Sequence, residues 1–218
     1  MSELDELAAR FAAVYTGAIT DVLDRHGYRQ QTLPPSLRAL RPGMRLAGPA
    51  FCVEGRPRPG IGYDESIRSV LAMLGEVRPG HVAVYQTHDA ASAHLGELSV
   101  TSLKGRGCAG AVVDGGCRDV AYILREEFPV FCRYTTPQDC VGRWEVVSSE
   151  APITIGGVRI DPGDYVVADS DGVVVVPSAV RDDALAEAEK VVTTESEIRT
   201  AVRAGTLPLA AYERYGKF

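Results

Sequence analysis

Three charged residues in the middle of the chain have the types and the spacing to bind a small acid together with a metal ion. Glu97 lies 21 positions before the adjacent pair Arg118 and Asp119. The sequence between them is typical of a helix, an apolar strand and a glycine turn, so all three side chains are predicted at one edge of a sheet. Ligands bind open α/β sheets at this edge, beyond the carboxyl ends of the strands.

The residue types favour a ligand that carries a carboxylate. The planar guanidinium of Arg118 matches a carboxylate with two parallel hydrogen bonds, and the unpaired N–H groups at the start of a helix form a further anion site. Asp119 and Glu97 supply the oxygen ligands that Mg²⁺ or Mn²⁺ prefers. Metal and arginine together suggest a 2-oxo acid substrate, whose enolate the metal would stabilise when a carbon–carbon bond breaks.

Each piece of this pattern also has a structural explanation. Aspartate is common at the start of a helix, where it interacts favourably with the helix dipole, and the tripeptide DGG is common in turns. Judged alone, the Arg118-Asp119 pair and Glu97 therefore favour structural roles. Only the convergence of the three residues favours a role in binding or catalysis.

The elements that would position these residues follow from apolar periodicity. The pattern predicts helices over residues 3–26, 64–76, 98–104, 118–127 and 179–203, and strands over residues 46–53, 82–85, 109–113 and 129–133. Between residues 82 and 133 strands and helices alternate with short links, which is typical of parallel βαβ units. The loop over 88–97 and the glycine turn over 114–119 would then face the same crevice, with Gly115 and Gly116 leaving room for a ligand or a backbone.

The C-terminal part of the chain has a different pattern. Residues 144–177 contain short apolar strands separated by Gly-Gly and Pro-Gly-Asp turns, which is typical of antiparallel hairpins. The long helix over 179–203 is predicted to end in an irregular tail. The fold class is therefore α/β, with parallel βαβ units joined to antiparallel hairpins.

Composition limits the function classes. A chain of 218 residues that is 45% hydrophobic suits a single domain over residues 1–218. The net charge of −6 and the absence of a basic run disfavour nucleic acid and membrane surfaces as partners. The five cysteines show no C-x-x-C spacing and are predicted to be reduced thiols. With no signal-peptide pattern and no apolar run of spanning length, a cytoplasmic location is expected.

Several longer motifs resemble a known family. The run GAVVDGGCRDV, preceded by an acid in the pattern D/E-x20-R-D, is similar to the RraA-like superfamily. That superfamily includes the class II 4-hydroxy-4-methyl-2-oxoglutarate / 4-carboxy-4-hydroxy-2-oxoadipate aldolases and the regulator of ribonuclease E activity. The resemblance extends to RPGMRLAGPAFCV, ADSDGVVVVP and ESEIRTAVRAG, and so spans most of the chain.

The resemblance implies a role for each residue. Arg118 would bind the substrate carboxylate, Asp119 would hold Mg²⁺ or Mn²⁺ directly, and Glu97 would contact the metal through water. Glu97 stands where an aspartate is expected in the aldolases, which could change the choice of substrate. The anion-binding loop corresponds to four residues whose backbone amides would take the pyruvyl carboxylate: Gly96, Glu97, Leu98 and Ser99.

The resemblance also implies the fold and the assembly. Family members have an α/β sandwich of the swivelling β/β/α type and form homotrimers, sometimes paired into hexamers. A glutamate from the C-terminal helix of a neighbouring subunit completes the aldolase site, and Glu195 is the candidate here, with Glu197 as the alternative. Residues 178–218 would accordingly contact a neighbouring subunit.

Two functions remain open at this level. The first is a lyase that cleaves a 4-hydroxy-2-oxo acid or decarboxylates oxaloacetate, in either case to pyruvate. The second is a protein that binds and inhibits ribonuclease E; such regulators lack a counterpart of residues 178–218, which favours the lyase. Methyl transfer is disfavoured because no G-x-G-x-x-G loop follows a strand.

Other polar residues are expected to be structural. They are His88 and His94 as surface or hydrogen-bonding residues, Cys117 as a packing residue, Asp169 and Asp171 as turn residues, and Lys104 as a cap of its own helix.

Overall fold

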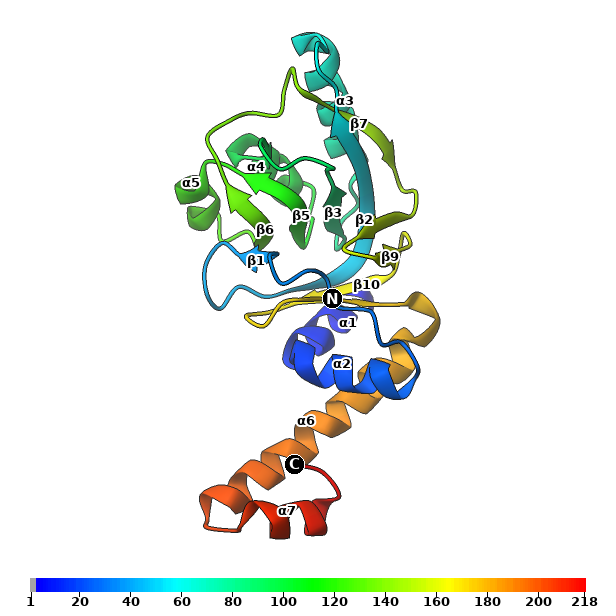
Figure 1. Ribbon diagram of the computed structural model, residues 1–218, viewed down its shortest axis with the longest axis vertical. Coiled ribbons are helices and arrows are strands. Elements are labelled where there is room, and N and C mark those ends of the chain that lie inside the picture. Colours follow the sequence, from blue (N-terminus) through cyan, green and yellow to red (C-terminus); the bar gives the residue numbers. More distant parts are fainter. Residues whose placement is uncertain (1–2) are drawn as a thin grey trace.

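One mixed, curled sheet forms the frame of the protein in the computed structural model, which describes residues 3–218 (Figure 1). Its strands follow the order β1-β6-β5-β3-β2-β10-β11, with β4 beside β5 and β7 beside β2. The strands are β1 (Arg38–Ala39), β2 (Leu46–Pro57), β3 (Val82–Gln86), β4 (Ala93–Leu95), β5 (Gly110–Cys117), β6 (Val130–Thr135), β7 (Trp144–Ser149), β10 (Tyr165–Ala168) and β11 (Val173–Val176). A separate hairpin consists of β8 (Ile153–Ile155) and β9 (Val158–Ile160).

The predicted βαβ units are confirmed. Strands β2, β3, β5 and β6 are parallel neighbours. The helices between them, α3 (Tyr63–Glu76), α4 (Glu97–Gly105) and α5 (Val120–Arg125), lie on one face of the sheet (Figure 1). The carboxyl ends of β3 and β5 therefore lead into loops on the same side, as the sequence predicted.

The predicted antiparallel part is also confirmed, and β2 joins the two parts. Strand β10 pairs antiparallel with both β11 and the first half of β2, while β7 pairs antiparallel with the second half of β2. Because β2 has 12 residues, it extends through both parts of the sheet. The fold is the predicted α/β class.

Three apolar clusters stabilise these layers. The first packs α3, α4 and α5 against one face of the parallel strands, and the second fills the space between the opposite face and the β8–β9 hairpin. The third packs the N-terminal helices and the start of the long C-terminal helix against β10 and β11. Strand residues alternate between clusters, as Val112 and Val113 do, because successive side chains point to opposite faces.

The single helix predicted over residues 3–26 is wrong, because the segment forms two helices. Helix α1 (Glu3–Ala13) ends before α2 (Thr16–Arg25) begins. The buried Asp169 carboxylate accepts hydrogen bonds from Thr16 N at 2.9 Å and Thr16 Oγ1 at 2.7 Å, so it caps α2 from the β10–β11 turn. Asp169 is thus a turn residue, as predicted, with the additional task of ending one helix and starting the next.

The irregular tail after residue 203 is a second wrong prediction. The long helix is confirmed as α6 (Arg181–Arg203), preceded by a 3-10 turn (Ser178–Val180), but α7 (Pro208–Tyr215) follows it. Proline suits the first position of a helix, and Gly216 in the left-handed conformation ends it. Helices α6 and α7 project from the body, at the opposite end of the molecule from α3 (Figure 1). No helix within residues 3–218 is long and apolar enough to cross a membrane.

Candidate active site

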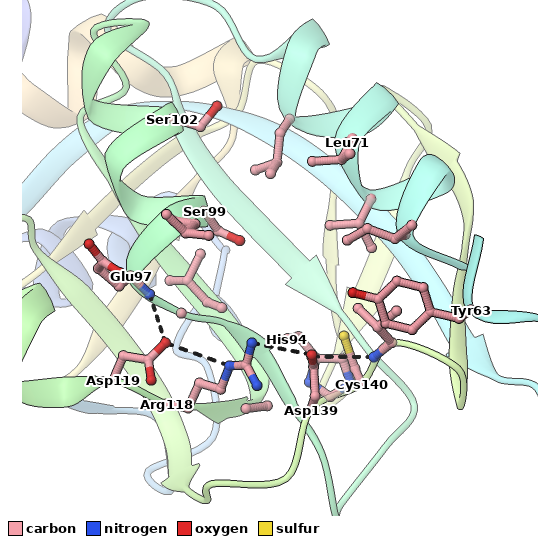
Figure 2. A pocket seen from close by; sticks show the side chains of 18 residues that line it. Tyr63, Leu71, His94, Glu97, Ser99, Ser102, Arg118, Asp119, Asp139 and Cys140 are labelled. Carbon is pink, nitrogen blue, oxygen red and sulfur yellow. Dashed lines mark hydrogen bonds and ion pairs between the residues drawn. The ribbon is translucent and has the colours of Figure 1, made fainter. Parts of the chain in front are cut away.

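The sequence-predicted residues Arg118, Asp119 and 96–99 converge on one pocket between α3, α4 and the start of α5 (Figure 2). The pocket has a volume of about 290 Å³. Its wall consists of Tyr63, Ile67, Val70, Leu71, Leu74, Ala93, His94, Leu95, Gly96, Glu97, Leu98, Ser99, Ser102, Arg118, Asp119, Asp139, Cys140 and Val141. The predicted convergence of the two strand-to-helix loops is therefore found in the structure.

Asp119 connects the two loops. It precedes α5 in the left-handed conformation, with φ at 56°, which aspartate tolerates better than most residues. Its Oδ2 accepts a hydrogen bond of 3.1 Å from the backbone N–H of Glu97 (Figure 2). A Cβ atom on Gly96 would lie 2.7 Å from that same oxygen. The absence of a side chain at Gly96 is thus what allows the carboxylate to reach the start of α4.

Arg118 lies between two carboxylates. Its Nε is 3.6 Å from Asp119 Oδ2, and its Nη2 is 3.2 Å from Asp139 Oδ2. Its backbone N–H donates to Leu95 O, which fixes the residue against β4. The side chain is 37% exposed, so part of the guanidinium still faces the pocket. The arrangement orients the arginine and leaves it able to bind an anion.

Asp139 is the pocket residue that sequence reasoning missed. It lies in the loop after β6, where nothing in the surrounding PQDC distinguishes it from a turn residue. Its Oδ1 accepts the N–H of Val141 at 3.3 Å while Oδ2 contacts Arg118. Only the three-dimensional arrangement brings this loop to the site.

One amide of the predicted anion-binding loop already has an acceptor within the protein. The N–H of Glu97 is already bonded to Asp119, so the open donors in the first turn of α4 are those of Leu98 and Ser99, which have no acceptor within the helix. The Glu97 carboxylate points away from Arg118 (Figure 2).

The carboxylate oxygen atoms of the pocket could supply part of the coordination shell of a divalent metal ion. Within residues 3–218, no group of three or more His, Cys, Asp and Glu side chains is arranged to hold a metal. Asp119 nevertheless uses only one carboxylate oxygen in its bond to Glu97, which leaves Oδ1 for a ligand. Mg²⁺ commonly binds proteins through one or two carboxylates and completes its shell with water and substrate. The free oxygen of Asp119 suits a Mg²⁺ site of this kind, in which water and substrate supply the other ligands.

Glu195 and Glu197 are not brought to this pocket. Both lie on α6, which projects from the body away from α3 (Figure 1), and Glu195 Oε1 pairs with Lys217 Nζ at 2.7 Å. Either glutamate could reach a site of this kind only in another copy of the chain.

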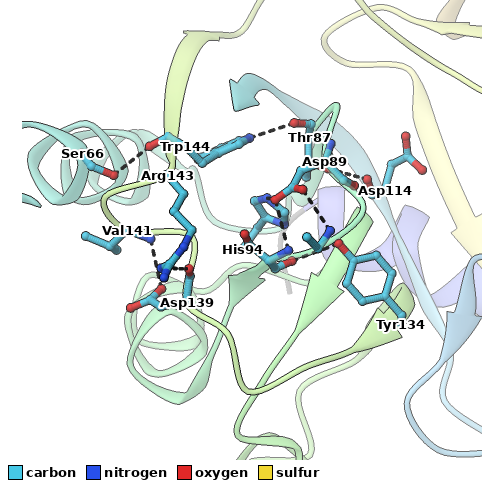
Figure 3. A network of polar contacts seen from close by, with 12 residues as sticks. Ser66, Thr87, Asp89, His94, Asp114, Tyr134, Asp139, Val141, Arg143 and Trp144 are labelled. Atoms are coloured by element: carbon cyan, nitrogen blue, oxygen red, sulfur yellow. Dashed lines mark hydrogen bonds and ion pairs between the residues drawn. The ribbon is translucent and has the colours of Figure 1, made fainter. Parts of the chain in front are cut away.

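His94 forms part of the pocket floor as a buried, neutral residue (Figure 3). Its Nε2 lies 3.2 Å from Asp89 Oδ2 without the geometry of a hydrogen bond, and its ring meets Trp144 edge-on at 5.0 Å. Burial lowers the pKa of His94 to about 4, although the Asp89 carboxylate opposes this. His94 is therefore uncharged at neutral pH. His88, in contrast, is half-exposed and lies 3.7 Å from Glu54, outside the pocket wall.

The glycine turn predicted over residues 114–119 is wrong, because β5 continues to Cys117. Gly115 and Gly116 make room for protein atoms: added Cβ atoms would lie 2.7 Å from Thr87 Oγ1 and 2.4 Å from the Tyr134 ring. The predicted loop over 88–97 likewise contains the short strand β4. These tight contacts hold the floor of the pocket to the sheet (Figure 3).

The remaining polar candidates are structural. The five cysteines are buried and free, as predicted. The side chain of Cys117 makes a hydrogen bond with Cys132 that, together with burial, raises the pKa of Cys117, which agrees with a packing role. Lys104 was expected to cap its own helix, but its Nζ donates to the Glu126 carbonyl at 2.7 Å and so caps α5.

The family model described as RraA-like, Aldolase/RraA, matches residues 16–175. The chain belongs to the RraA-like family. A relative from Halalkalibacterium halodurans, named "Putative 4-hydroxy-4-methyl-2-oxoglutarate aldolase", is 30% identical over 97% of this chain and 95% of its own length. The RraA-like match includes the whole segment from Gly96 to Asp119 that forms the polar end of the pocket.

Solved structures extend the similarity of this RraA-like chain. Streptomyces coelicolor RraAS2, described as an unusual member of the RNase ES inhibitor RraA protein family, has a TM-score of 0.79 and 32% identity, covering 89% of this chain and 96% of its own. An uncharacterized protein from Pseudomonas syringae has a TM-score of 0.87 and 26% identity, covering 97% of this chain and 94% of its own. The long C-terminal helix therefore falls within the matched fold.

Replacing Gly96 with alanine tests whether the close approach of the two loops determines the geometry of the pocket. The new methyl group would lie 2.7 Å from Asp119 Oδ2 and 3.1 Å from Arg118 Cγ, so at least one of these side chains must move. Displacements of about 1 Å can reduce function by about 100-fold. We expect the affinity for oxalate with Mg²⁺, measured by calorimetry, to fall by roughly 10- to 100-fold.

Gly105→Ala, at the other end of α4, is the matched control. A Cβ atom there meets nothing within 4 Å, so oxalate affinity should stay at the wild-type value. Wild-type affinity in Gly96→Ala as well would show that the contact with Asp119 does not constrain the site.

Proposed function

We propose that this chain is a divalent-metal-dependent lyase that cleaves a 4-hydroxy-2-oxo acid to pyruvate by a retro-aldol reaction and also decarboxylates oxaloacetate. The observation that carries the proposal is the pocket in which Arg118 lies between Asp119 and Asp139, beside the open first turn of α4. The name of the Halalkalibacterium relative supports the same reaction class.

Each residue has a task that its position permits. Arg118 would bind the carboxylate of the oxo acid, with the N–H groups of Leu98 and Ser99 as further donors. Asp119 would hold Mg²⁺ or Mn²⁺ through its free oxygen, and Glu97 would contact the ion through water after rotation of its side chain. The ion, when bound, supplies Lewis-acid stabilisation of the enolate. Asp139 would keep Arg118 in place as the substrate enters.

Substitutions at the two central residues should separate substrate binding from metal binding. We expect Arg118→Ala to raise KM for oxaloacetate and to lower kcat/KM by about 100-fold or more, because a charge-stabilising donor is lost. Asp119→Asn keeps an acceptor for the Glu97 N–H but weakens the metal site, so excess Mn²⁺ should restore part of its activity. Pyruvate release, coupled to a dehydrogenase, measures both effects.

Arg125→Ala is the matched control for the arginine. Arg125 lies on the adjacent α5 and its guanidinium stacks 4.2 Å above the Tyr122 ring, outside the pocket wall. Its loss should leave kcat/KM unchanged. Purified wild-type protein that releases no pyruvate from oxaloacetate or 4-hydroxy-2-oxo acids, with either metal, would contradict the proposed function.

The proposed active form is a homotrimer, or two paired trimers, with a site shared between subunits. Glu195, or alternatively Glu197, would enter the pocket of a neighbour as a further metal ligand. In support, α6 and α7 project from the body and α7 presents exposed apolar side chains, with Leu209 at 68% and Tyr212 at 53%. Exposed apolar clusters of this kind mark interaction surfaces.

Mixed assemblies test the shared site directly. Arg118→Ala and Glu195→Gln chains should each be inactive, but a mixed ring contains interfaces where an intact Arg118 meets an intact Glu195. For random trimers with equal mixing we expect about a quarter of the wild-type activity, since each site needs one chain of each kind in the right order. Co-produced chains with two different affinity tags would be purified and assayed for pyruvate release.

The same experiment with Glu197→Gln decides between the two glutamates. The glutamate that supplies the metal ligand is the one whose Gln variant is inactive alone and regains activity in the mixture. Full activity of both Glu195→Gln and Glu197→Gln would show that neither residue completes the site, and that the Glu195–Lys217 pair is purely structural.

Ribonuclease inhibition is the second candidate function, supported by the similarity to Streptomyces coelicolor RraAS2. An inhibitor acts through its surface, so Asp119→Asn should not affect it, whereas the lyase should lose activity. Inhibition of ribonuclease E that is equal in wild type and Asp119→Asn, combined with no pyruvate release, would favour this candidate over the lyase.

A further inference from the structure

The far wall of the pocket has no charged side chain and is mostly apolar, with the hydroxyl groups of Tyr63 and Ser102 as its polar atoms. Opposite the polar end, α3 contributes Tyr63, Ile67 and Leu71, and α4 adds Leu98. Leu71 is 58% exposed and Leu98 is 78% exposed, so neither side chain is needed to fill the core. Figure 2 shows Tyr63 and Leu71 on the side of the pocket opposite Asp119. A ligand anchored at Arg118 would extend toward this wall.

The charges of the pocket lie at one end and are mostly negative. In the described part of the chain its wall contains three carboxylates, those of Glu97, Asp119 and Asp139, and one cation, Arg118. His94 adds no charge, because burial lowers its pKa to about 4. A divalent ion would offset the acids, and Arg118 would then neutralise one substrate carboxylate. A second substrate carboxylate would find no further cation among the residues of this wall, since Arg68 of α3 lies outside the wall and pairs with Asp64.

We infer that the substrate is a 4-hydroxy-2-oxo monocarboxylic acid with an alkyl or aryl group at C4, and that this group packs against Tyr63, Leu71 and Leu98. The inference rests on the proposed lyase function and specifies its substrate class. It differs from the substrate in the name of the Halalkalibacterium relative, since 4-hydroxy-4-methyl-2-oxoglutarate has a second carboxylate. Placing that carboxylate against leucine side chains would remove its hydrating water without supplying a cation to replace it, which is unfavourable in free energy.

The reaction balances with this substrate. The bond between C3 and C4 breaks and its electron pair stays on C3, which gives pyruvate enolate. The 4-hydroxyl group loses its proton and its oxygen becomes the carbonyl of an apolar aldehyde or ketone, while C3 takes up a proton to give pyruvate. The second product, an aldehyde or ketone, would leave along the apolar wall. An enzyme that oxidises or reduces aldehydes or ketones would then have to consume it.

Substrate preference tests the inference. Pyruvate release would be compared for 4-hydroxy-2-oxoheptanoate, 4-hydroxy-2-oxo-4-phenylbutanoate, 4-hydroxy-2-oxoglutarate and 4-hydroxy-4-methyl-2-oxoglutarate. Oxaloacetate is included as a substrate whose second carboxylate is C4 itself and leaves as CO2, so that nothing extends beyond C4 toward the apolar wall. We expect kcat/KM for the two apolar substrates to exceed that for the two dicarboxylates by at least about tenfold, a discrimination that pocket contacts of this kind provide.

Leu71→Arg should shift this preference, because it places a cation on the apolar wall at an exposed position. The ratio of apolar to dicarboxylate kcat/KM should fall by about tenfold or more. Leu71→Met, which keeps the wall apolar at similar volume, is the control and should leave the ratio unchanged.

The outcomes separate the inference from the proposed function. Dicarboxylates preferred by the wild type, or a ratio that does not respond to Leu71→Arg, would overturn the inference alone; in the first case a neighbouring subunit would have to supply the second cation. No pyruvate from any substrate, oxaloacetate included, would overturn the lyase function and the inference together.

Discussion

The hydrogen bond from the Glu97 backbone to the Asp119 carboxylate is the contact on which the pocket depends. It joins the loop that follows β4 to the loop that follows β5, so the starts of α4 and α5 are held at one place. Asp119 makes this bond from the left-handed conformation, which aspartate adopts more readily than most residues. Glycine at position 96 allows this bond, because an added Cβ would lie 2.7 Å from Asp119 Oδ2 and the carboxylate would have to shift.

The position of the Arg118 side chain depends on this contact. With Asp119 fixed on one side, the guanidinium extends along the pocket to Asp139, which comes from a loop far along the chain. Two carboxylates reduce the free positive charge of the arginine, so a monoanion must offer more than simple attraction to displace them. A carboxylate does so by forming two parallel hydrogen bonds with the guanidinium. The pairing therefore favours planar carboxylates over other small anions and keeps the arginine ordered before the ligand binds.

The sequence predicted the parts of the fold that depend on local patterns. Apolar periodicity and glycine positions located α3, α4 and β3. The convergence of the two loops that carry Glu97 and the Arg118-Asp119 pair followed from the rule that parallel strands end at one edge, although the Glu97 carboxylate points away from Arg118. The break between α1 and α2 could not be predicted, because the apolar stripe continues through it and the capping carboxylate, Asp169, is 153 positions away. Helix α7 was not predicted because it has only eight residues, and its signals, a proline at the start and a glycine at the end, are equally common in irregular segments.

In the site, too, the features that depend on local sequence could be predicted and those that depend on distant residues could not. Residue types indicated Arg118 and Asp119, but Asp139 has no local signal, and the extension of β5 through Gly115 and Gly116 became visible only with the Thr87 and Tyr134 side chains that fill the space beside them. These glycines were expected to leave room for a ligand or a backbone, and the atoms beside them belong to the protein: the Thr87 side chain at Gly115, and the Tyr134 ring and the Ser92 carbonyl oxygen at Gly116. A missing Cβ shows only that something comes close. Which atoms come close is set by Thr87, which follows β3, by Tyr134 on β6 and by Ser92, at positions that no local pattern connects.

The polar and apolar ends of the pocket order a substrate along its length. In the proposed lyase, a carboxylate held at Arg118 would place the neighbouring oxo group near Asp119, the proposed metal ligand, and the next two carbons would extend from this end toward α3. The bond that breaks would thus lie between a charged region, which stabilises the enolate, and an apolar wall, which suits an uncharged leaving product. Charge would build up only on the fragment that stays at the polar end. An apolar group at C4 would keep that separation, whereas a second carboxylate would place charge at both ends of the pocket.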